Sequence, residues 1–94
     1  MVTNVDIGTL IVSTPDVCEG RPRITGKRFS VEQIATLTKE GLSPQQILRE
    51  YDFLTLAEVH AALAHYYANQ EQIEQYLADE IAEYQQLLVQ YKTD

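Results

Sequence analysis

The sequence predicts a mostly α-helical domain with a short N-terminal β-strand or hairpin, three short helices and a long C-terminal helix. Capping signals and apolar residues at helical spacing mark three consecutive helices between residues 30 and 69. Residues 70–92 contain neither Gly nor Pro and consist mainly of helix-forming residues. A length of 94 residues with 45% hydrophobic content suits one domain with one core. We therefore expect a single domain over 1–94, made of an arm (1–29), a three-helix body (30–69) and a C-terminal helix (70–94).

The arm contains two segments with strand character. Residues 7–12 are rich in aliphatic and β-branched side chains and predict a short strand. Thr14-Pro15-Asp16 then has the composition of a turn. Because a short strand is unstable alone, we expect residues 7–12 to pair with residues 23–25 or with a second chain.

Each of the three body helices begins with a predicted capping box, in which a Ser or Thr is followed three residues later by Gln or Glu. The pairs are Ser30 with Gln33, Ser43 with Gln46, and Thr55 with Glu58. Gly41 suits the left-handed residue that ends the first helix. The second and third helices, joined by a short turn, have the outline of a helix-turn-helix.

A DNA-reading third helix would present Thr55, Glu58 and His60 near its N-terminus. These side chains and the neighbouring alanines cannot make the hydrogen bonds by which Arg or Lys recognises guanine. Arg49 is the only Arg or Lys between residues 43 and 67. A helical unit that serves only as a scaffold explains the same pattern.

A second candidate for DNA contact is the basic loop RPRITGKR, which carries Arg21, Arg23, Lys27 and Arg28 within eight residues. Such an arm can contact phosphates beside a helix-turn-helix. The alternative is that these cations pair with acids of the helical body, with Arg28 as a buried structural partner. The charge distribution permits either, because residues 1–30 sum to +1 while the whole chain carries −7.

The C-terminal helix carries an apolar seam with heptad spacing. Its members are Leu77, Ile81, Tyr84, Leu88 and Tyr91, and Ile73 and Tyr76 broaden it. This stripe is wider than the last turns of a small domain normally cover, so we expect it to contact another copy of the chain or a partner protein. The alternative is that the helix folds back on the three-helix body.

The sequence predicts no catalytic or cofactor site. His60 and His65 are five residues apart, whereas zinc pairs on a helix are three or four apart, so we expect no metal. A single cysteine permits no internal disulfide, and no convergent catalytic set accompanies it. No segment reaches the ~20 apolar residues that span a membrane, and the N-terminus has no secretion-signal pattern, so we expect a cytoplasmic protein.

Residues 12–67 resemble the bacterial domain of unknown function family 433. The resemblance rests on a Pro-Asp turn, a Gly-x-Pro, an Ile-x-Gly-x-Arg, a Gly-x-Ser-x-x-x-Ile helix and a final helix with a Val-x-x-Ala-Leu run. Here those positions are Pro15, Asp16, Gly20, Pro22, Ile24, Gly26, Arg28, Val31, Gly41, Ser43, Ile47, Tyr51, Leu54, Val59, Ala62 and Leu63. The sequence departs from the usual pattern at Lys27, where Thr is usual, and at Ser30, where Pro is common.

The resemblance implies a homeodomain-like helix-turn-helix and an antitoxin that partners a PIN-like nuclease toxin. We therefore expect a non-catalytic regulatory protein. Its body would bind operator DNA as a homodimer, and its C-terminal helix would bind the toxin. The alternative is a protein–protein interaction module without nucleic-acid binding.

Overall fold

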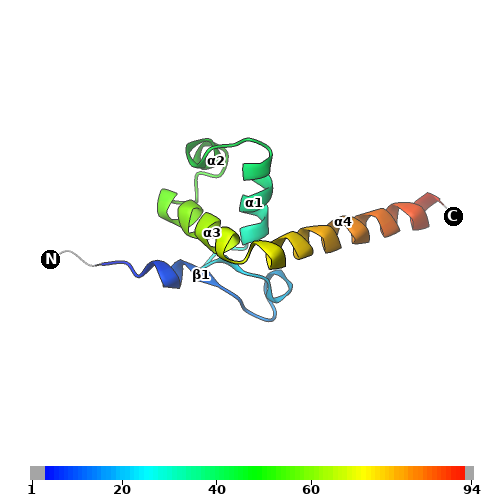
Figure 1. Ribbon diagram of the computed structural model, residues 1–94, viewed down its shortest axis with the longest axis horizontal. Coiled ribbons are helices and arrows are strands. Elements are labelled where there is room, and N and C mark those ends of the chain that lie inside the picture. Colours follow the sequence, from blue (N-terminus) through cyan, green and yellow to red (C-terminus); the bar gives the residue numbers. More distant parts are fainter. Residues whose placement is uncertain (1–3, 93–94) are drawn as a thin grey trace.

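The structure, a computed structural model, describes residues 4–92 and is mostly helical (Figure 1). Its helices are α1 (Val31–Lys39), α2 (Pro44–Glu50), α3 (Leu56–Ala68) and α4 (Gln70–Lys92). Two short strands, β1 (Ile11–Val12) and β2 (Arg23–Ile24), and two 3-10 helices, at Ile7–Leu10 and Cys18–Gly20, precede them. The predicted fold class is confirmed.

The two strands form the predicted N-terminal hairpin. They run antiparallel, with Ile11 opposite Ile24 and Val12 opposite Arg23. The expected strand over residues 7–12 is wrong in its first part, because residues 7–10 form a 3-10 helix. The Asp6 carboxylate caps that turn by accepting a hydrogen bond from the Gly8 amide at 2.9 Å, which fixes the helical turn locally.

The three body helices begin at the predicted residues. Ser30, Ser43 and Thr55 are their N-caps, and both hydrogen bonds of each capping box are present. Gly41 has a φ of +97°, and the amides of Gly41 and Leu42 donate back to Thr38 and Leu37. This is a Schellman ending, which stops α1 cleanly and turns the chain into α2.

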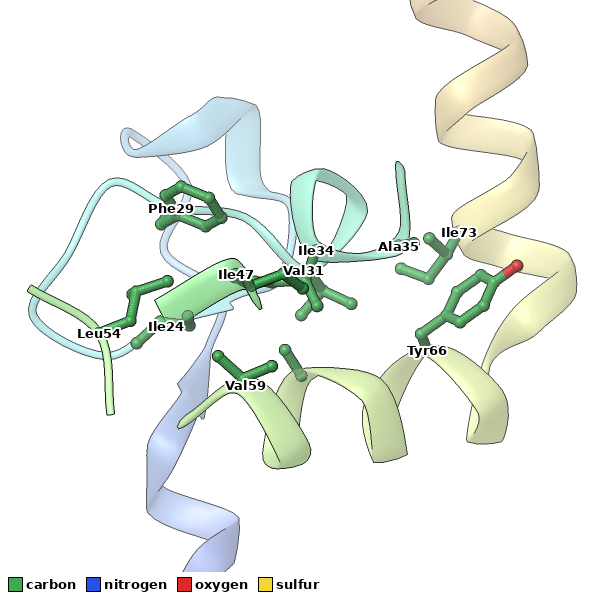
Figure 2. Close-up of a cluster of buried hydrophobic side chains, with 11 residues drawn as sticks. Ile24, Phe29, Val31, Ile34, Ala35, Ile47, Leu54, Val59, Tyr66 and Ile73 are labelled. Atoms are coloured by element: carbon green, nitrogen blue, oxygen red, sulfur yellow. The ribbon is translucent and has the colours of Figure 1, made fainter. Parts of the chain in front are cut away.

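The core lies where α1, α2 and α3 meet the hairpin (Figure 2). Its fully buried side chains include Ile24 from β2, Val31 and Ile34 from α1, Ile47 from α2 and Val59 from α3. Phe29 joins the core from the loop before α1 and makes an edge-to-face contact with Tyr51 at 4.9 Å between ring centroids. The body is therefore a three-helix unit closed on one side by the hairpin.

The chain changes direction at Asn69, where the backbone leaves the helical region and α4 begins. The first turns of α4 pack on α1 and α3, and the rest of the helix projects beyond the body (Figure 1). The molecule measures 63 Å along its longest axis but 29 and 23 Å along the others. No helix in residues 4–92 combines the length and apolarity that crossing a membrane requires.

Candidate interaction surfaces

The basic loop is largely engaged with the body. Nη1 of Arg21 lies 3.2 Å from both carboxylate oxygens of Glu32 on α1 and 2.7 Å from Oε1 of Glu80 on α4. Its guanidinium also stacks over the ring of Tyr76, 4.9 Å from the centroid. Arg21 therefore links the arm to both α1 and α4.

Arg23 and Lys27 also have internal partners. The Arg23 guanidinium donates to the Lys27 carbonyl at 3.2 Å and to the Thr14 hydroxyl at 3.1 Å, which holds the hairpin loop together. The Lys27 ammonium lies 2.6 Å from Oε1 of Glu58 on α3. Burial opposes ionisation of Glu58, but hydrogen bonds from Lys27 and from the Thr55 amide outweigh it and lower the Glu58 pKa.

Two basic side chains remain exposed beside the helix-turn-helix. Arg28 and Arg49 make no hydrogen bond or ion pair with the part of the chain described here. The expectation that Arg28 is a buried structural partner is therefore wrong, and Arg21, with 13% of its side chain exposed, takes that role. Arg28 points outward because the next residue, Phe29, turns into the core.

The N-terminus of α3 differs from the predicted reading surface. Thr55 and His60 are exposed, as a DNA-reading helix requires. Glu58 is instead buried, because its carboxylate completes the capping box and pairs with Lys27. Its prediction as an exposed contact residue is wrong.

The inner half of α4, which we define as residues 70–80, belongs to the body. Ile73 is fully buried and contacts the core cluster, and Tyr76 packs at its edge. Glu74 accepts hydrogen bonds from the Lys39 ammonium and from the Tyr66 hydroxyl. Ile73 and Tyr76 were predicted as partner contacts, and that prediction is wrong for Ile73 because the core of its own chain already covers it.

The outer half of α4, residues 81–92, contacts little of the body. Ile81 is 59% exposed, Tyr84 64% and Leu88 43%, while Leu77 at the junction is half-buried. We call Leu77, Ile81, Tyr84 and Leu88 the outer seam. The side chain of Tyr91, the last predicted member, lies outside the described residues.

The outer seam borders a groove of about 460 Å³ between α4 and α1, with Thr36 on the α1 side. A second hollow adjoins this groove at Gln85 and is lined by Ala82, Gln85, Gln86, Val89 and Gln90. The two hollows share Gln85, and three of the five side chains that line the second one are glutamines.

The sequence reasoning missed the cluster of Arg21, Glu32 and Glu80. Glu32 has only 4% of its side chain exposed, and Glu80 has 53%. Burial, then hydrogen bonding and repulsion from Glu80, raise the pKa of Glu32 from 4.5 to about 7, although Arg21 opposes the shift. The place of Glu32 as an acid in the first turn of α1 was the only local signal, and it gave no indication of these partners.

No group of three or more His, Cys, Asp or Glu side chains within the described part of the chain could hold a metal ion. His60 is exposed, and His65 is half-buried on α3, where burial lowers its pKa.

Comparisons with known proteins agree with the predicted resemblance. The family model described as "Protein of unknown function (DUF433)" matches residues 11–68. The crystal structure of a DUF433 member protein from Anabaena variabilis ATCC 29413 is similar, with 33% sequence identity and a TM-score of 0.70. The similarity covers 74% of this chain and 69% of that one. No curated protein matches the chain. The chain belongs to the DUF433 family, whose function is unknown.

Proposed function

We propose that this protein is a non-catalytic regulator of the antitoxin type that binds other polypeptides through the outer half of α4. The observation that carries the proposal is the exposure of Ile81, Tyr84, Leu87, Leu88 and Val89 on a helix that projects beyond the body (Figure 1). Apolar side chains exposed along a projecting helix are typical of a protein-binding surface.

The arrangement of α4 supports binding by a rigid element. Its inner half is anchored by the buried Ile73 and by ion pairs from Lys39 to Glu74 and from Arg21 to Glu80. The outer half therefore extends from a fixed base, which reduces the conformational entropy lost on binding. The proposed partner is a PIN-like nuclease, which the outer half would hold inactive.

Removal of residues 81–94 tests this proposal. We expect the shortened chain to keep its fold, because Ile73, Tyr76 and Leu77 remain. It should lose measurable binding to a nuclease encoded beside its gene, by isothermal titration calorimetry, and should no longer inhibit that nuclease. Undiminished binding by the shortened, folded chain would contradict the proposal.

A second function, operator binding by the body, is favoured by the positions of the exposed cations Arg28 and Arg49. Arg28 precedes Phe29, and Arg49 lies two residues before Tyr51, whose ring contacts Phe29. Both cations therefore lie close to the turn between α2 and α3, where a helix-turn-helix meets the DNA backbone. Glu50 and Asp52, exposed at the same turn, oppose DNA binding.

We expect the double variant Arg28→Gln, Arg49→Gln to weaken binding to the DNA upstream of the gene by about tenfold or more, because two phosphate contacts are lost. Fluorescence anisotropy at two salt concentrations measures this effect, and the salt dependence should become shallower. Lys39→Gln is the matched control, since Lys39 pairs with Glu74 at the far end of α1. If the wild-type protein does not bind this DNA, the chain is an interaction module without a nucleic-acid role.

A further inference from the structure

We infer that the outer seam is a self-association surface, which packs antiparallel against the outer seam of a second copy. The two-fold axis passes near Tyr84 and Gln85, so that Ile81 of each copy faces Leu88 of the other. This inference rests on the proposed function, in which the outer half of α4 binds a polypeptide, and it names the occupant of the outer seam.

The charge distribution selects a second copy rather than a basic partner for this face. The chain carries −7, so two copies repel each other at most approaches. Residues 81–92 form an exception, because they carry only Glu83 and Lys92 and are otherwise Gln, Ala, Tyr and aliphatic residues. Between Ile81 and Leu88 the positions beside the seam are occupied by Gln85 and Leu87. Two copies can therefore meet here without opposing like charges.

The acids that would attract a basic partner lie elsewhere on α4. They belong mainly to the inner half, and two of them are already neutralised, Glu74 by Lys39 and Glu80 by Arg21. The outer seam thus has no carboxylate row to offer a basic protein. The uncharged side chains of the same seam on a second copy are the chemically matched partner.

The spacing of the seam suits pairing with itself. Ile81, Tyr84 and Leu88 step by three and four residues, which places them on one side of the helix as knobs of a coiled coil. An antiparallel pair centred between residues 84 and 85 sets the two tyrosines together at the axis. It also brings the C-terminal end of each helix opposite Leu77 of the other.

The groove beside α1 enlarges this contact. A stable interface buries about 800 Å² per partner, more than a few seam side chains supply. The groove of about 460 Å³ begins at Leu77 and Thr36, where the antiparallel arrangement places the end of the second copy's α4. The end of that helix fills the groove, so the interface extends from the helix pair onto the body.

Antiparallel pairing of the two α4 helices also keeps the three-helix bodies of the two copies apart. In a parallel pair, the inner halves and their exposed acids Glu71 and Asp79 would lie side by side with those of the second copy. In the antiparallel pair, the two bodies lie at opposite ends of the paired helices. The face of the helix that carries Ala82, Gln86 and Val89 lies outside this contact, and the nuclease of the proposed function would bind there.

Sedimentation of the full-length chain, purified without any other protein, tests self-association. We expect a dimer that dissociates on dilution. The double variant Ile81→Glu, Leu88→Glu should raise the dimer dissociation constant by about a hundredfold or more, because it buries charge in the interface. The control Ala82→Glu, Gln86→Glu adds the same charge to exposed positions off the seam and should change that constant by about twofold at most. Circular dichroism confirms that both variants keep their helices.

Pulsed electron spin resonance on a Gln72→Cys label, in a Cys18→Ser background, tests the direction. With a helical rise of 1.5 Å per residue, the antiparallel pair separates the two labels by about 40 Å, whereas a parallel pair brings them within about 15 Å. The longer distance supports the inference, and the shorter one overturns it.

A chain that stays monomeric at high concentration, or a control variant as disruptive as the seam variant, also overturns the inference. If such a monomer still loses nuclease binding when residues 81–94 are removed, the proposed function stands and self-association alone fails. If the seam-dependent dimer forms but residues 81–94 are dispensable for nuclease binding, the proposed function fails and the self-association surface stands.

Discussion

Replacing Ile73 with Ala is expected to lower the free energy of unfolding by about 2–4 kcal/mol. Ile73 is fully buried although it lies in the first turns of a helix that mostly projects from the body. Figure 2 shows its side chain beside Tyr66 of α3 and near Ala35 of α1. Its truncation leaves a cavity between three helices, and helices joined by a direction change at Asn69 have limited freedom to close it.

Ile81→Ala is the matched control, because it removes the same atoms from the same helix two turns later. Ile81 is 59% exposed, so we expect a loss below about 1 kcal/mol when denaturation is followed in dilute, monomeric protein. Equal losses for the two variants would contradict the division of α4 into a core-bound inner half and an exposed outer half.

The second large effect is expected at the Arg21, Glu32 and Glu80 cluster, and it depends on pH. The pKa of Glu32 is raised from 4.5 to about 7, so the folded protein holds a proton that the unfolded chain has lost between these values. Stability from this group is therefore present below about pH 4.5 and falls as the pH rises to about 7. We expect the fall to reach about 3 kcal/mol, because each unit of pKa difference corresponds to about 1.4 kcal/mol and the carboxyl is almost fully buried.

Glu32→Gln should remove this dependence while keeping an oxygen that can accept a hydrogen bond from Arg21. The difference in unfolding free energy between the wild-type protein and the variant isolates Glu32 from the other shifted groups. Glu58 and His65 have lowered pKa values and act in the opposite direction, losing stability as the pH falls. A difference that stays constant between pH 4.5 and 8 would contradict the assigned environment of Glu32.

The local features of the fold could be predicted because they depend on neighbouring residues. Ser30, Ser43 and Thr55 cap helices through residues three positions away, and Gly41 ends α1 through its own backbone. These signals span at most a few residues, so the sequence contains them directly. The 3-10 helix at residues 7–10 escaped prediction because the capping carboxylate of Asp6 outweighed the strand preference of the aliphatic residues after it.

The candidate surfaces could be predicted only in part, because they depend on the path of the chain. Ile73 and Ile81 are the same residue type on one apolar stripe, yet only the angle of α4 to the body decides which is buried. Likewise, Arg21 meets Glu32 and Glu80 from 11 and 59 residues away. Composition identified four cations in the arm, but it could not show that three are held by partners and that Arg28 is left exposed.

Amide hydrogen exchange along α4, measured by NMR at several protein concentrations, tests most directly whether the helix is divided between core and interface. We expect the amides from Ile73 to Leu77 to exchange slowly at every concentration, because only unfolding of the body opens them. The amides beyond Ile81 should exchange quickly in dilute protein and slow down as the concentration rises. Uniform protection along the whole helix in dilute protein, or rapid exchange at Ile73, would contradict this division.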